Sequence, residues 1–301
     1  MEYRRLGRTE FEVSSIGLGC VTFGREIDDE TSFGILDHAL ERGINLLDTA
    51  EGYHAGASER VLGAWMNARG VRDQVVLATK VAPPLGKQRV IQSTEESLER
   101  LQTDRIDIFQ LHDWDGETEL DDTLAALGTL VEQGKVRYCA CSNFSAWQLA
   151  KALLAAERGA PRMESIQPPY NLVQREIEPD LLPLCRDQEV GVMSYSPLGA
   201  GFLTGKYRQG DEVPSGTRFD VIPGHQPIYF TDHGWRVVEG LRAKADEIGR
   251  SMIQLALNWT IHQPGVTSVL VGARHTGHVD QAFEAESADI PQTIRDELSA
   301  F

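Results

Sequence analysis

Residues 136–159 read VRYCACSNFSAWQLAKALLAAERG and contain one complete example of the pattern that decides the fold. Val136–Ser142 is a short apolar run, which is typical of a strand buried on both faces. Ala146–Glu157 carries apolar residues at helical spacing. Ser145 stands where a helix N-cap is favoured, and Gly159 follows the helix, where a left-handed residue often ends one. The stretch therefore predicts a strand followed by a helix, the unit of a parallel α/β sheet.

The same unit recurs along the rest of the chain. Further apolar runs predict strands at Ser15–Leu18, Ile44–Asp48, Val75–Lys80, Ile106–His112, Ser165–Gln167, Val190–Tyr195 and Ser268–Val271. Amphipathic stretches between them predict helices at Asp28–Arg42, Ser58–Asn67, Arg89–Leu101, Leu120–Gln133 and Glu178–Gln188. Eight alternating units favour an α/β fold of the closed (β/α)₈ TIM-barrel type over an open doubly wound sheet. No linker or composition break divides the chain, so residues 1–301 are predicted to form one domain.

Two segments stand outside this alternation. Residues 1–13 are predicted to form a short N-terminal β-hairpin that turns at Gly7-Arg8. Pro197–His233 is the least regular stretch and is rich in glycine and proline. Loops of this length in a compact domain are usually functional. This one follows the seventh predicted strand, on the face where barrel active sites lie, so we expect it to cover a bound ligand.

Composition excludes several classes of function. The chain has 29 Lys and Arg against 45 Asp and Glu, a formal net charge of −16. We therefore expect no nucleic acid or membrane partner, since phosphate binding needs clustered basic residues. The longest stretch free of charged side chains, Ser251–Ala273, contains polar residues and a proline and does not read as a membrane span. The first residues show no apolar signal-peptide core, and four scattered cysteines make no disulfide framework, so we expect a cytoplasmic location.

Four reactive side chains follow predicted strands, at the carboxyl ends where barrel active sites lie: Asp48, Tyr53, Lys80 and His112. A general acid that protonates a carbonyl oxygen needs a pKa drawn towards neutrality. A lysine ammonium about 4 Å away favours tyrosinate by roughly 4 kcal/mol at most, so we expect Lys80 to lower the pKa of Tyr53. Asp48 would keep Lys80 charged, and His112 would orient the carbonyl. Taken singly, an aspartate at a strand end is more often a helix N-cap, a lysine a solvent-exposed side chain and a tyrosine a packing residue. It is the occurrence of all four at equivalent positions, with matching chemistry, that predicts catalysis.

Motifs spread over the whole chain resemble those of the aldo-keto reductases. They include Gly43-Ile-Asn-Leu-Leu-Asp48-Thr-Ala-Glu-Gly-Tyr53, Thr79-Lys80, Gln110-Leu-His112, Ser142-Asn143-Phe144, Tyr195-Ser-Pro-Leu-Gly199 and Gly272-Ala-Arg274. The Ser-Asn-Phe and Tyr-Ser-Pro-Leu-Gly blocks look most like the branch of bacterial and plant reductases and potassium-channel β-subunits. The resemblance implies that Asp48, Tyr53, Lys80 and His112 form the catalytic tetrad. It also implies that Tyr53 is the proton donor when an aldehyde or ketone is reduced.

The resemblance further implies a bound NADP(H). Around the nicotinamide it implies Ser142, Asn143, Gln167 and Tyr195, with the Tyr195 ring stacked on the nicotinamide. Around the pyrophosphate and adenosine it implies Ser196, Leu198, Gly199, Gly201, Lys206, Gly272, Arg274 and His278. Lysine suits a phosphate, and the less favoured alternative for Lys206 is an ordinary surface lysine after a turn. Arg274 is the expected partner of the 2′-phosphate, because a guanidinium fork matches phosphate geometry, so NADPH is expected in preference to NADH.

The chain departs from the family pattern at three places. His54 stands where a glycine commonly follows the catalytic tyrosine, and it could reach the substrate mouth or simply cover a loop. The usual Arg-Asn-Pro-Glu-Gln run reads Arg274-His-Thr-Gly-His278, and Ala282 replaces a common asparagine, so NAD remains the alternative coenzyme. His275 and His278 have a spacing that suits a metal, but no third ligand is evident and no metal is predicted.

The sequence therefore predicts an NADPH-dependent oxidoreductase that converts a small carbonyl compound to an alcohol. Hydride would come from nicotinamide C4 and the proton from Tyr53. The alternative is a cofactor-binding redox sensor or regulatory subunit that resembles the potassium-channel β-subunits. Aromatic residues that could line the substrate mouth, or simply pack, are Phe23, Trp114, Tyr229, Phe230 and Trp235. The sequence leaves the substrate, the reaction direction and the oligomeric state open.

Overall fold

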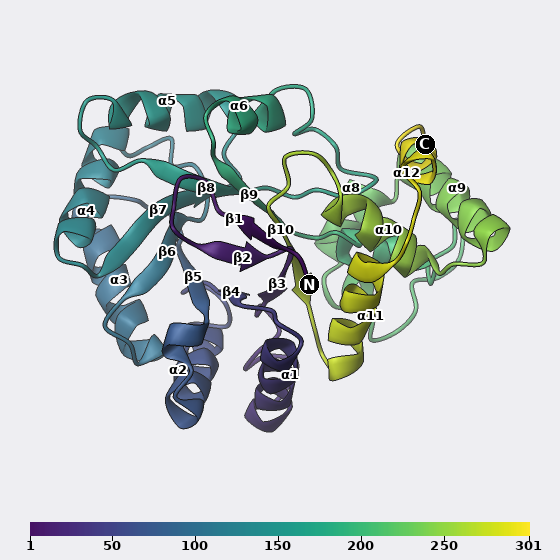
Figure 1. Ribbon diagram of the computed structural model, residues 1–301, viewed down its shortest axis with the longest axis horizontal. Helices are drawn as coiled ribbons and strands as arrows, with labels where there is room; N and C mark the ends of the chain where they lie inside the picture. Colours follow the sequence, from purple (N-terminus) through teal and green to yellow (C-terminus); the bar gives the residue numbers. More distant parts are fainter.

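A computed structural model describes residues 1–301 and contains a closed barrel of eight parallel strands surrounded by helices (Figure 1). The barrel strands are β3 (Ile16–Gly19), β4 (Leu46–Asp48), β5 (Val76–Val81), β6 (Ile106–Leu111), β7 (Val136–Ser142), β8 (Met163–Gln167), β9 (Gly191–Ser194) and β10 (Ser268–Gly272). Neighbouring strands follow chain order, and β10 closes the barrel against β3. Every predicted strand is present to within two residues, so the prediction of a (β/α)₈ barrel is confirmed.

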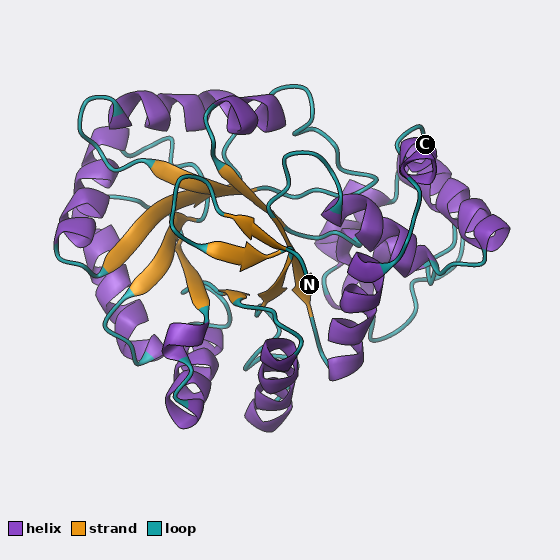
Figure 2. Cartoon of the chain, in the orientation of Figure 1, coloured by secondary structure: helices purple, strands orange, loops and turns teal.

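Helices cover the outside of the barrel (Figure 2). Before β9 they are α1 (Asp29–Glu41), α2 (Ala57–Arg69), α3 (Lys87–Leu101), α4 (Leu120–Glu132), α5 (Ala146–Ala156) and α6 (Leu181–Asp187), with a 3₁₀ turn η1 (Arg72–Gln74). After β9 come η2 (Gly199–Thr204), α7 (Arg218–Val221), η3 (Pro223–His225), α8 (Gln226–Tyr229), α9 (Asp232–Ile248) and α10 (Met252–Ile261). After β10 come α11 (Thr276–Ser287) and α12 (Gln292–Leu298). None of these helices combines the length and the apolar character that crossing a membrane requires.

Local sequence explains where two helices begin. Ser145 and Gln148 form a capping box at the start of α5, in which each side chain binds the backbone N–H of the other residue. The helix α6 begins at Leu181, three residues later than predicted. Pro183 accounts for the difference, because a residue without a backbone N–H is tolerated only in the first turn of a helix.

The predicted hairpin is present as β1 (Tyr3–Arg5) paired antiparallel with β2 (Glu12–Ser14). It closes the amino-terminal end of the barrel, where Leu6 and Val13 pack into the apolar barrel interior. The turn requires a glycine at position 7, since its φ is +57° and a Cβ there would lie 2.1 Å from a backbone oxygen of β8.

Alternate residues of each strand point into the barrel, and their character changes along its axis. Near the hairpin the inward residues are apolar, and they include Leu46, Ile108 and Met193. Towards the carboxyl ends the buried inward residues become polar or charged. The barrel is therefore closed by apolar packing at one end and carries its ionisable groups at the other.

Up to the start of α9 at Asp232, the long segment Pro197–His233 contains only short helical turns, as its composition predicts. It is organised by an aromatic cluster of Phe202, Tyr207, Phe219, Tyr229, Phe230 and Trp235, in which the rings of Phe202 and Trp235 lie 4.9 Å apart. Tyr229 and Trp235 are buried in this cluster, and Phe23 is buried in the main core. These three residues therefore pack and do not line a substrate mouth, because each finds apolar partners inside the fold.

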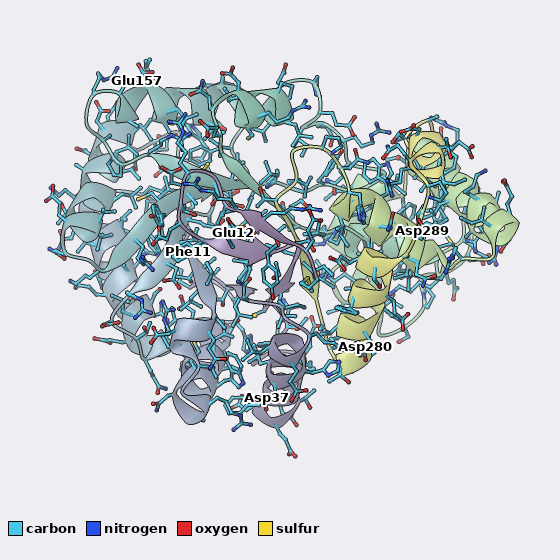
Figure 3. The ribbon with its side chains drawn as sticks, viewed as in Figure 1. Phe11, Glu12, Asp37, Glu157, Asp280 and Asp289 are labelled. Carbon is cyan, nitrogen blue, oxygen red and sulfur yellow. The ribbon has the colours of Figure 1, made fainter.

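The outer surface carries the negative charge expected from the composition. Side chains such as Asp37, Glu157 and Asp280 lie at the periphery of the molecule (Figure 3). Some are paired locally, as Asp37 is with Arg69 at 2.9 Å. The excess of carboxylates is thus distributed over the helices that surround the barrel.

Candidate active site

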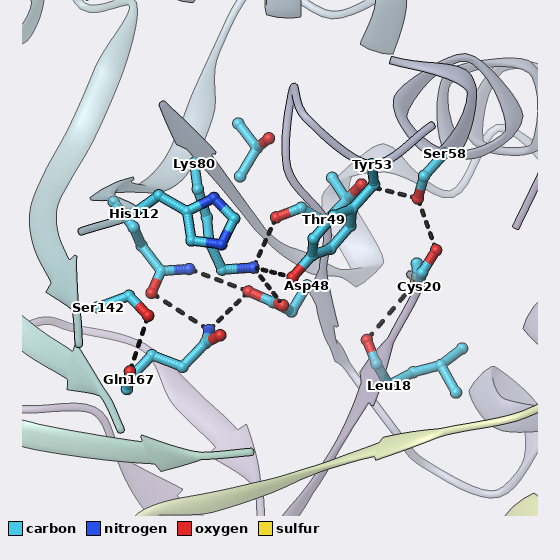
Figure 4. A network of polar contacts seen from close by, with 12 residues as sticks. Leu18, Cys20, Asp48, Thr49, Tyr53, Ser58, Lys80, His112, Ser142 and Gln167 are labelled. Atoms are coloured by element: carbon cyan, nitrogen blue, oxygen red, sulfur yellow. Dashed lines mark hydrogen bonds and ion pairs between the residues drawn. The ribbon is translucent and has the colours of Figure 1, made fainter. Parts of the chain in front are cut away.

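The four predicted catalytic side chains converge at the carboxyl end of the barrel (Figure 4). Asp48 ends β4, Tyr53 lies in the following loop, Lys80 lies in β5 and His112 immediately follows β6. The Lys80 ammonium donates hydrogen bonds to Asp48 Oδ2 at 2.6 Å, to the Thr49 carbonyl at 2.8 Å and to the Tyr53 hydroxyl at 3.1 Å. All three donors of the buried ammonium are therefore used, and one of them is directed at the tyrosine oxygen.

The pKa of Tyr53 differs from the value expected from the sequence. Burial is the largest influence on Tyr53 and raises its pKa above the usual value, Lys80 opposes that shift, and Asp48 adds to it. Lys80 therefore lowers the pKa of Tyr53 as expected, but burial outweighs this effect, and the expectation that the net pKa would be drawn towards neutrality is wrong. The reason is that burial disfavours the charged phenolate, and the Asp48 carboxylate adds a smaller effect in the same direction. Burial also opposes the charge of Lys80, but Asp48 and Tyr53 together keep the Lys80 pKa above its ordinary value.

His112 faces the tyrosine across the cleft. The two rings are arranged edge to face, with centroids 5.9 Å apart. Burial, and then the nearby charge of Lys80, lower the pKa of His112. The imidazole is therefore neutral near pH 7 and can donate one N–H bond.

Asp48 is the centre of a second set of contacts that sequence reasoning did not assign. Its Oδ1 atom accepts a hydrogen bond from Gln110 Nε2 at 2.9 Å and another from Gln167 Nε2 at 2.8 Å. Gln110 is fully buried and lies two residues before His112 on β6. That spacing places it on the inward face of the strand, which is the signal that could have identified it.

Two glutamates anchor the elements that carry Tyr53, and sequence reasoning missed both. Glu51 accepts hydrogen bonds from the Ala82 backbone at 3.0 Å, from Arg89 at 2.5 Å and from the hydroxyl of Ser93. The loop between β4 and α2 is thereby tied to α3. Glu59, fully buried in α2, accepts bonds from Thr79 Oγ1 and from Arg100 Nε, each at 2.6 Å. The contact with Thr79 holds α2 against the residue that precedes Lys80.

A cleft of about 680 Å³ opens above these residues, a volume within the range of small-molecule sites. Among the predicted site residues, its walls include Asp48, Tyr53, His112, Ser142, Asn143, Gln167, Tyr195, Ser196, Leu198, Gly201, Lys206, Gly272, Arg274 and His278. Lys80 lies beneath the cleft floor. Gly199 does not line the cleft either; a Cβ there would lie 2.8 Å from the ring of Tyr229, so this glycine permits packing within the long segment.

The wall beside His112 is held in an unusual backbone conformation. Asn143 has a φ of +59°, Ser196 of +56° and Ala200 of +55°, values that side chains other than glycine seldom adopt. Asn143 donates through Nδ2 to the His112 carbonyl at 3.0 Å and accepts from the Tyr195 hydroxyl at 2.8 Å. Left-handed residues of this kind concentrate at functional sites, where the surrounding structure compensates for their strain.

The opposite end of the cleft is cationic. Lys206, Arg218 and Arg274 lie in its walls together with a single carboxylate, Glu26. Glu26 lies 3.5 Å from Arg218 and 4.0 Å from Arg274. Neither Glu26 nor Arg218 was singled out from the sequence, because each lies in an irregular segment that only the folded chain brings to the cleft.

The rings of the two histidines near Arg274, His275 and His278, lie in contact with centroids 3.9 Å apart and planes tilted by 40°. Burial, followed by the positive charge of His275, Arg274 and Lys206, lowers the pKa of His278 to about 4. His278 Nδ1 accepts a hydrogen bond from the Arg274 backbone N–H at 3.2 Å. His278 therefore helps to fix the backbone of Arg274.

His54, the departure next to Tyr53, is exposed and is not part of the cleft wall. Its φ is +49° and that of Ala55 is +51°, so two consecutive non-glycine residues adopt the left-handed conformation. Of the two readings of His54, the structure supports the one in which it covers a loop.

Replacing His54 by Gly is expected to raise the free energy of unfolding by up to about 1 kcal/mol. The left-handed conformation costs roughly 1–2 kcal/mol for a residue with a Cβ, and glycine's greater unfolded-state entropy offsets part of that gain. Urea unfolding of both proteins measures the difference. As a control, Ala125→Gly in α4 should destabilise by about 1 kcal/mol, since that exposed residue is helical. A His54→Gly protein as destabilised as the control would contradict the assignment of strain.

Comparison with known proteins gives a consistent pattern. A model of the aldo/keto reductase family matches residues 15–299. The uncharacterized oxidoreductase YrpG of Bacillus subtilis is 34% identical, over 98% of this chain and 94% of its own length. The aldo-keto reductase YhdN of the same organism is 34% identical, over 94% of this chain and 88% of its own length. A probable voltage-gated potassium channel subunit beta of Arabidopsis thaliana is 32% identical, over 95% of this chain and 91% of its own length.

Proposed function

The chain belongs to the aldo/keto reductase family, and on that premise we propose that it reduces an aldehyde or ketone to an alcohol with NADPH. The observation that carries the proposal is the hydrogen bond from the buried Lys80 ammonium to the Tyr53 hydroxyl at the floor of the cleft. This bond occupies a lone pair of the tyrosine oxygen and leaves its proton free to be donated into the cleft.

The cleft suits a nicotinamide dinucleotide phosphate. Lys206, Arg218 and Arg274 supply positive charge at one end, which matches a pyrophosphate and a 2′-phosphate. The other end offers the Tyr195 ring and the amides of Asn143 and Gln167 beside the catalytic side chains. When bound, NADPH supplies the hydride that the carbonyl carbon receives.

The residues of the chain supply the proton and orient the carbonyl. Tyr53 donates its hydroxyl proton to the carbonyl oxygen as that oxygen gains negative charge. The phenolate that remains develops beside the Lys80 ammonium, which is already within hydrogen-bond distance. Neutral His112 donates an N–H to the same carbonyl oxygen and holds it near Tyr53. The raised pKa of Tyr53 keeps the proton on the tyrosine until this step.

Arg274 is proposed to bind the 2′-phosphate and so to favour NADPH over NADH. Arg274→Ala is expected to raise the Kd for NADPH about ten- to a hundredfold, the usual value of a charge-assisted hydrogen bond, and to leave the Kd for NADH nearly unchanged. Fluorescence titration with both coenzymes measures the two constants. Arg208→Ala, which removes an exposed charge outside the cleft, is the matched control. Equal affinity of the unmodified protein for both coenzymes would refute the assignment.

The similarity to plant potassium-channel β-subunits favours a second candidate, a cofactor-binding sensor that acts through a partner. A screen of aldehydes, ketones and keto-sugars that follows NADPH absorbance separates the two. If the unmodified protein turns over any carbonyl compound and Tyr53→Phe abolishes that turnover, the reductase is supported. Tight NADPH binding without turnover supports the sensor.

We also propose that residues 1–301 act as one domain in the cytoplasm. All four cysteines are free and buried, which suits a reducing compartment. A small-molecule substrate is the proposed partner, and the net charge of −16 disfavours nucleic acid.

A further inference from the structure

One carboxylate lies at the cationic end of the cleft. The side chain of Glu26 places Oε1 3.5 Å from Arg218 and Oε2 4.0 Å from Arg274. Arg25 forms an ion pair with the same carboxylate. The only other carboxylate among the residues that line the cleft is Asp48, at the catalytic end. Glu26 is thus a lone negative charge in the region where the proposed function places the phosphates of the coenzyme.

The loop that carries Glu26 is fixed by contacts of its own. The Glu26 backbone N–H donates to the Thr22 carbonyl at 3.0 Å, and the Thr22 hydroxyl donates to the Ala273 carbonyl at 2.9 Å. The loop is thereby joined to the residue that precedes Arg274. At Gly24 the φ is +68° and a Cβ would lie 2.8 Å from a side chain of α2, so the backbone packs directly on that helix. The position of Glu26 is therefore set by the barrel and not by its attraction to the arginines.

The cations around Glu26 are only partly neutralised by it. Its separations from Arg218 and Arg274 exceed the roughly 2.7–2.9 Å of a close charge-assisted hydrogen bond, so both guanidinium groups keep N–H donors for another anion. Burial, and then the charge of Arg274, lower the pKa of Lys206. Burial, and then the charge of Arg25, lower the pKa of Arg218, and Glu26 opposes that shift. This end of the cleft therefore keeps positive charge for a phosphate, and Glu26 reduces it.

The two nicotinamide coenzymes would meet this carboxylate differently. A 2′-phosphate carries a charge of about −1.5 to −2 near neutral pH. Bound by Arg274, it would lie beside the carboxylate of Glu26, and the two anions would repel each other while they share one guanidinium. NADH carries a neutral hydroxyl at the same place, and an acidic side chain can accept a hydrogen bond from it. Glu26 therefore disfavours NADPH more than NADH.

We propose that Glu26 is a specificity-determining residue that competes with the 2′-phosphate for Arg274 and so narrows the preference for NADPH over NADH. The inference rests on the proposed function and deepens it, because it identifies the residue that opposes the phosphate. Arg274 and Glu26 then act in opposite directions, and the coenzyme preference of the protein is the balance between them.

Glu26→Gln tests this role, because it removes the charge and keeps the size of the side chain. The ratio of the Kd for NADH to the Kd for NADPH should rise about tenfold, the effect of one like-charge contact at about 4 Å in a partly hydrated site. The Glu26 side chain is 26% exposed, so water screens part of the repulsion. Fluorescence titration of the unmodified and variant proteins with both coenzymes gives the four constants.

Glu30→Gln is the matched control. It removes the same charge four residues away, at an exposed position of α1 that does not line the cleft, and it should leave the ratio unchanged. If Glu26→Gln tightened both coenzymes equally, Glu26 would act only on the charge of the whole cleft, and the proposal would be overturned. A fall in the ratio would overturn it too, since Glu26 would then assist the 2′-phosphate by orienting Arg274.

Two fragments without a nicotinamide give a second check that does not depend on turnover. Adenosine 2′,5′-bisphosphate and adenosine 5′-monophosphate differ only in the 2′-phosphate, and calorimetric titration measures both. Glu26→Gln should tighten the bisphosphate about tenfold and leave the monophosphate nearly unchanged. An equal effect on both fragments would overturn the proposal. If the unmodified protein bound neither coenzyme, the proposed function would fail as well; binding of NADPH that Glu26→Gln does not tighten would refute only the role of Glu26.

Discussion

Replacing Tyr53 by Phe is expected to lower kcat for the best carbonyl substrate by about 10²–10⁴, the usual contribution of a positioned general acid. The change removes one hydroxyl and leaves the ring to fill the same space. Lys80 keeps its bonds to Asp48 and to the Thr49 carbonyl, so the buried ion pair survives. The cofactor contacts assigned to Asn143, Gln167 and Tyr195 are not altered, and the Kd for NADPH should change little.

The measurement is steady-state turnover beside a fluorescence titration with NADPH. Tyr138→Phe is a suitable control, because its hydroxyl binds Glu10 at the other end of the barrel. Near-normal turnover by the Tyr53→Phe protein would show that the proton comes from another group. A large rise in the Kd for NADPH would show instead that Tyr53 holds the cofactor.

Replacing Lys80 by Met is expected to affect both stability and rate. It leaves Asp48 buried beneath the cleft without its ion-pair partner, and breaking a buried pair in this way typically costs about 3–5 kcal/mol. It also removes the donor at the Tyr53 oxygen, so the phenolate that forms during proton transfer loses its nearest positive charge. We expect a loss of kcat similar to that of Tyr53→Phe.

The double variant Lys80→Met with Asp48→Asn separates the two effects. The uncharged asparagine side chain no longer needs a counter-ion and retains a carbonyl oxygen that can accept from the buried glutamines. Urea unfolding should show that the double variant regains part of the lost stability, whereas its kcat stays low. If the double variant were destabilised by the full sum of the losses in Lys80→Met and in Asp48→Asn, the direct pairing of Asp48 with Lys80 would be contradicted.

The amino-acid sequence by itself determined the barrel and the convergence of the four side chains proposed to be catalytic. Apolar runs alternating with amphipathic stretches define eight strand–helix units, and the strands observed lie within two residues of those predicted. Because parallel strands of a barrel end on one face, residues that follow different strands must meet there. Asp48, Lys80 and His112 are therefore neighbours by topology, and Tyr53 follows on the adjoining loop.

Tertiary structure alone decided the properties that depend on distance and burial. The pKa of Tyr53 is raised because burial, together with the charge of Asp48, outweighs the opposing effect of Lys80, and residue order does not contain that balance. Trp235 and Tyr229 turn inward because the long segment builds an aromatic core of its own.

The buried contacts of Gln110 have the same origin. The sequence places it two residues before His112, but any inward polar residue would satisfy that spacing. What distinguishes Gln110 is that it donates to Asp48 Oδ1, which also accepts from Gln167, and itself accepts from Gln167. Hydrogen bonds act over about 3 Å and require specific angles, so residues 48, 110 and 167 become one unit only after the barrel has closed around them.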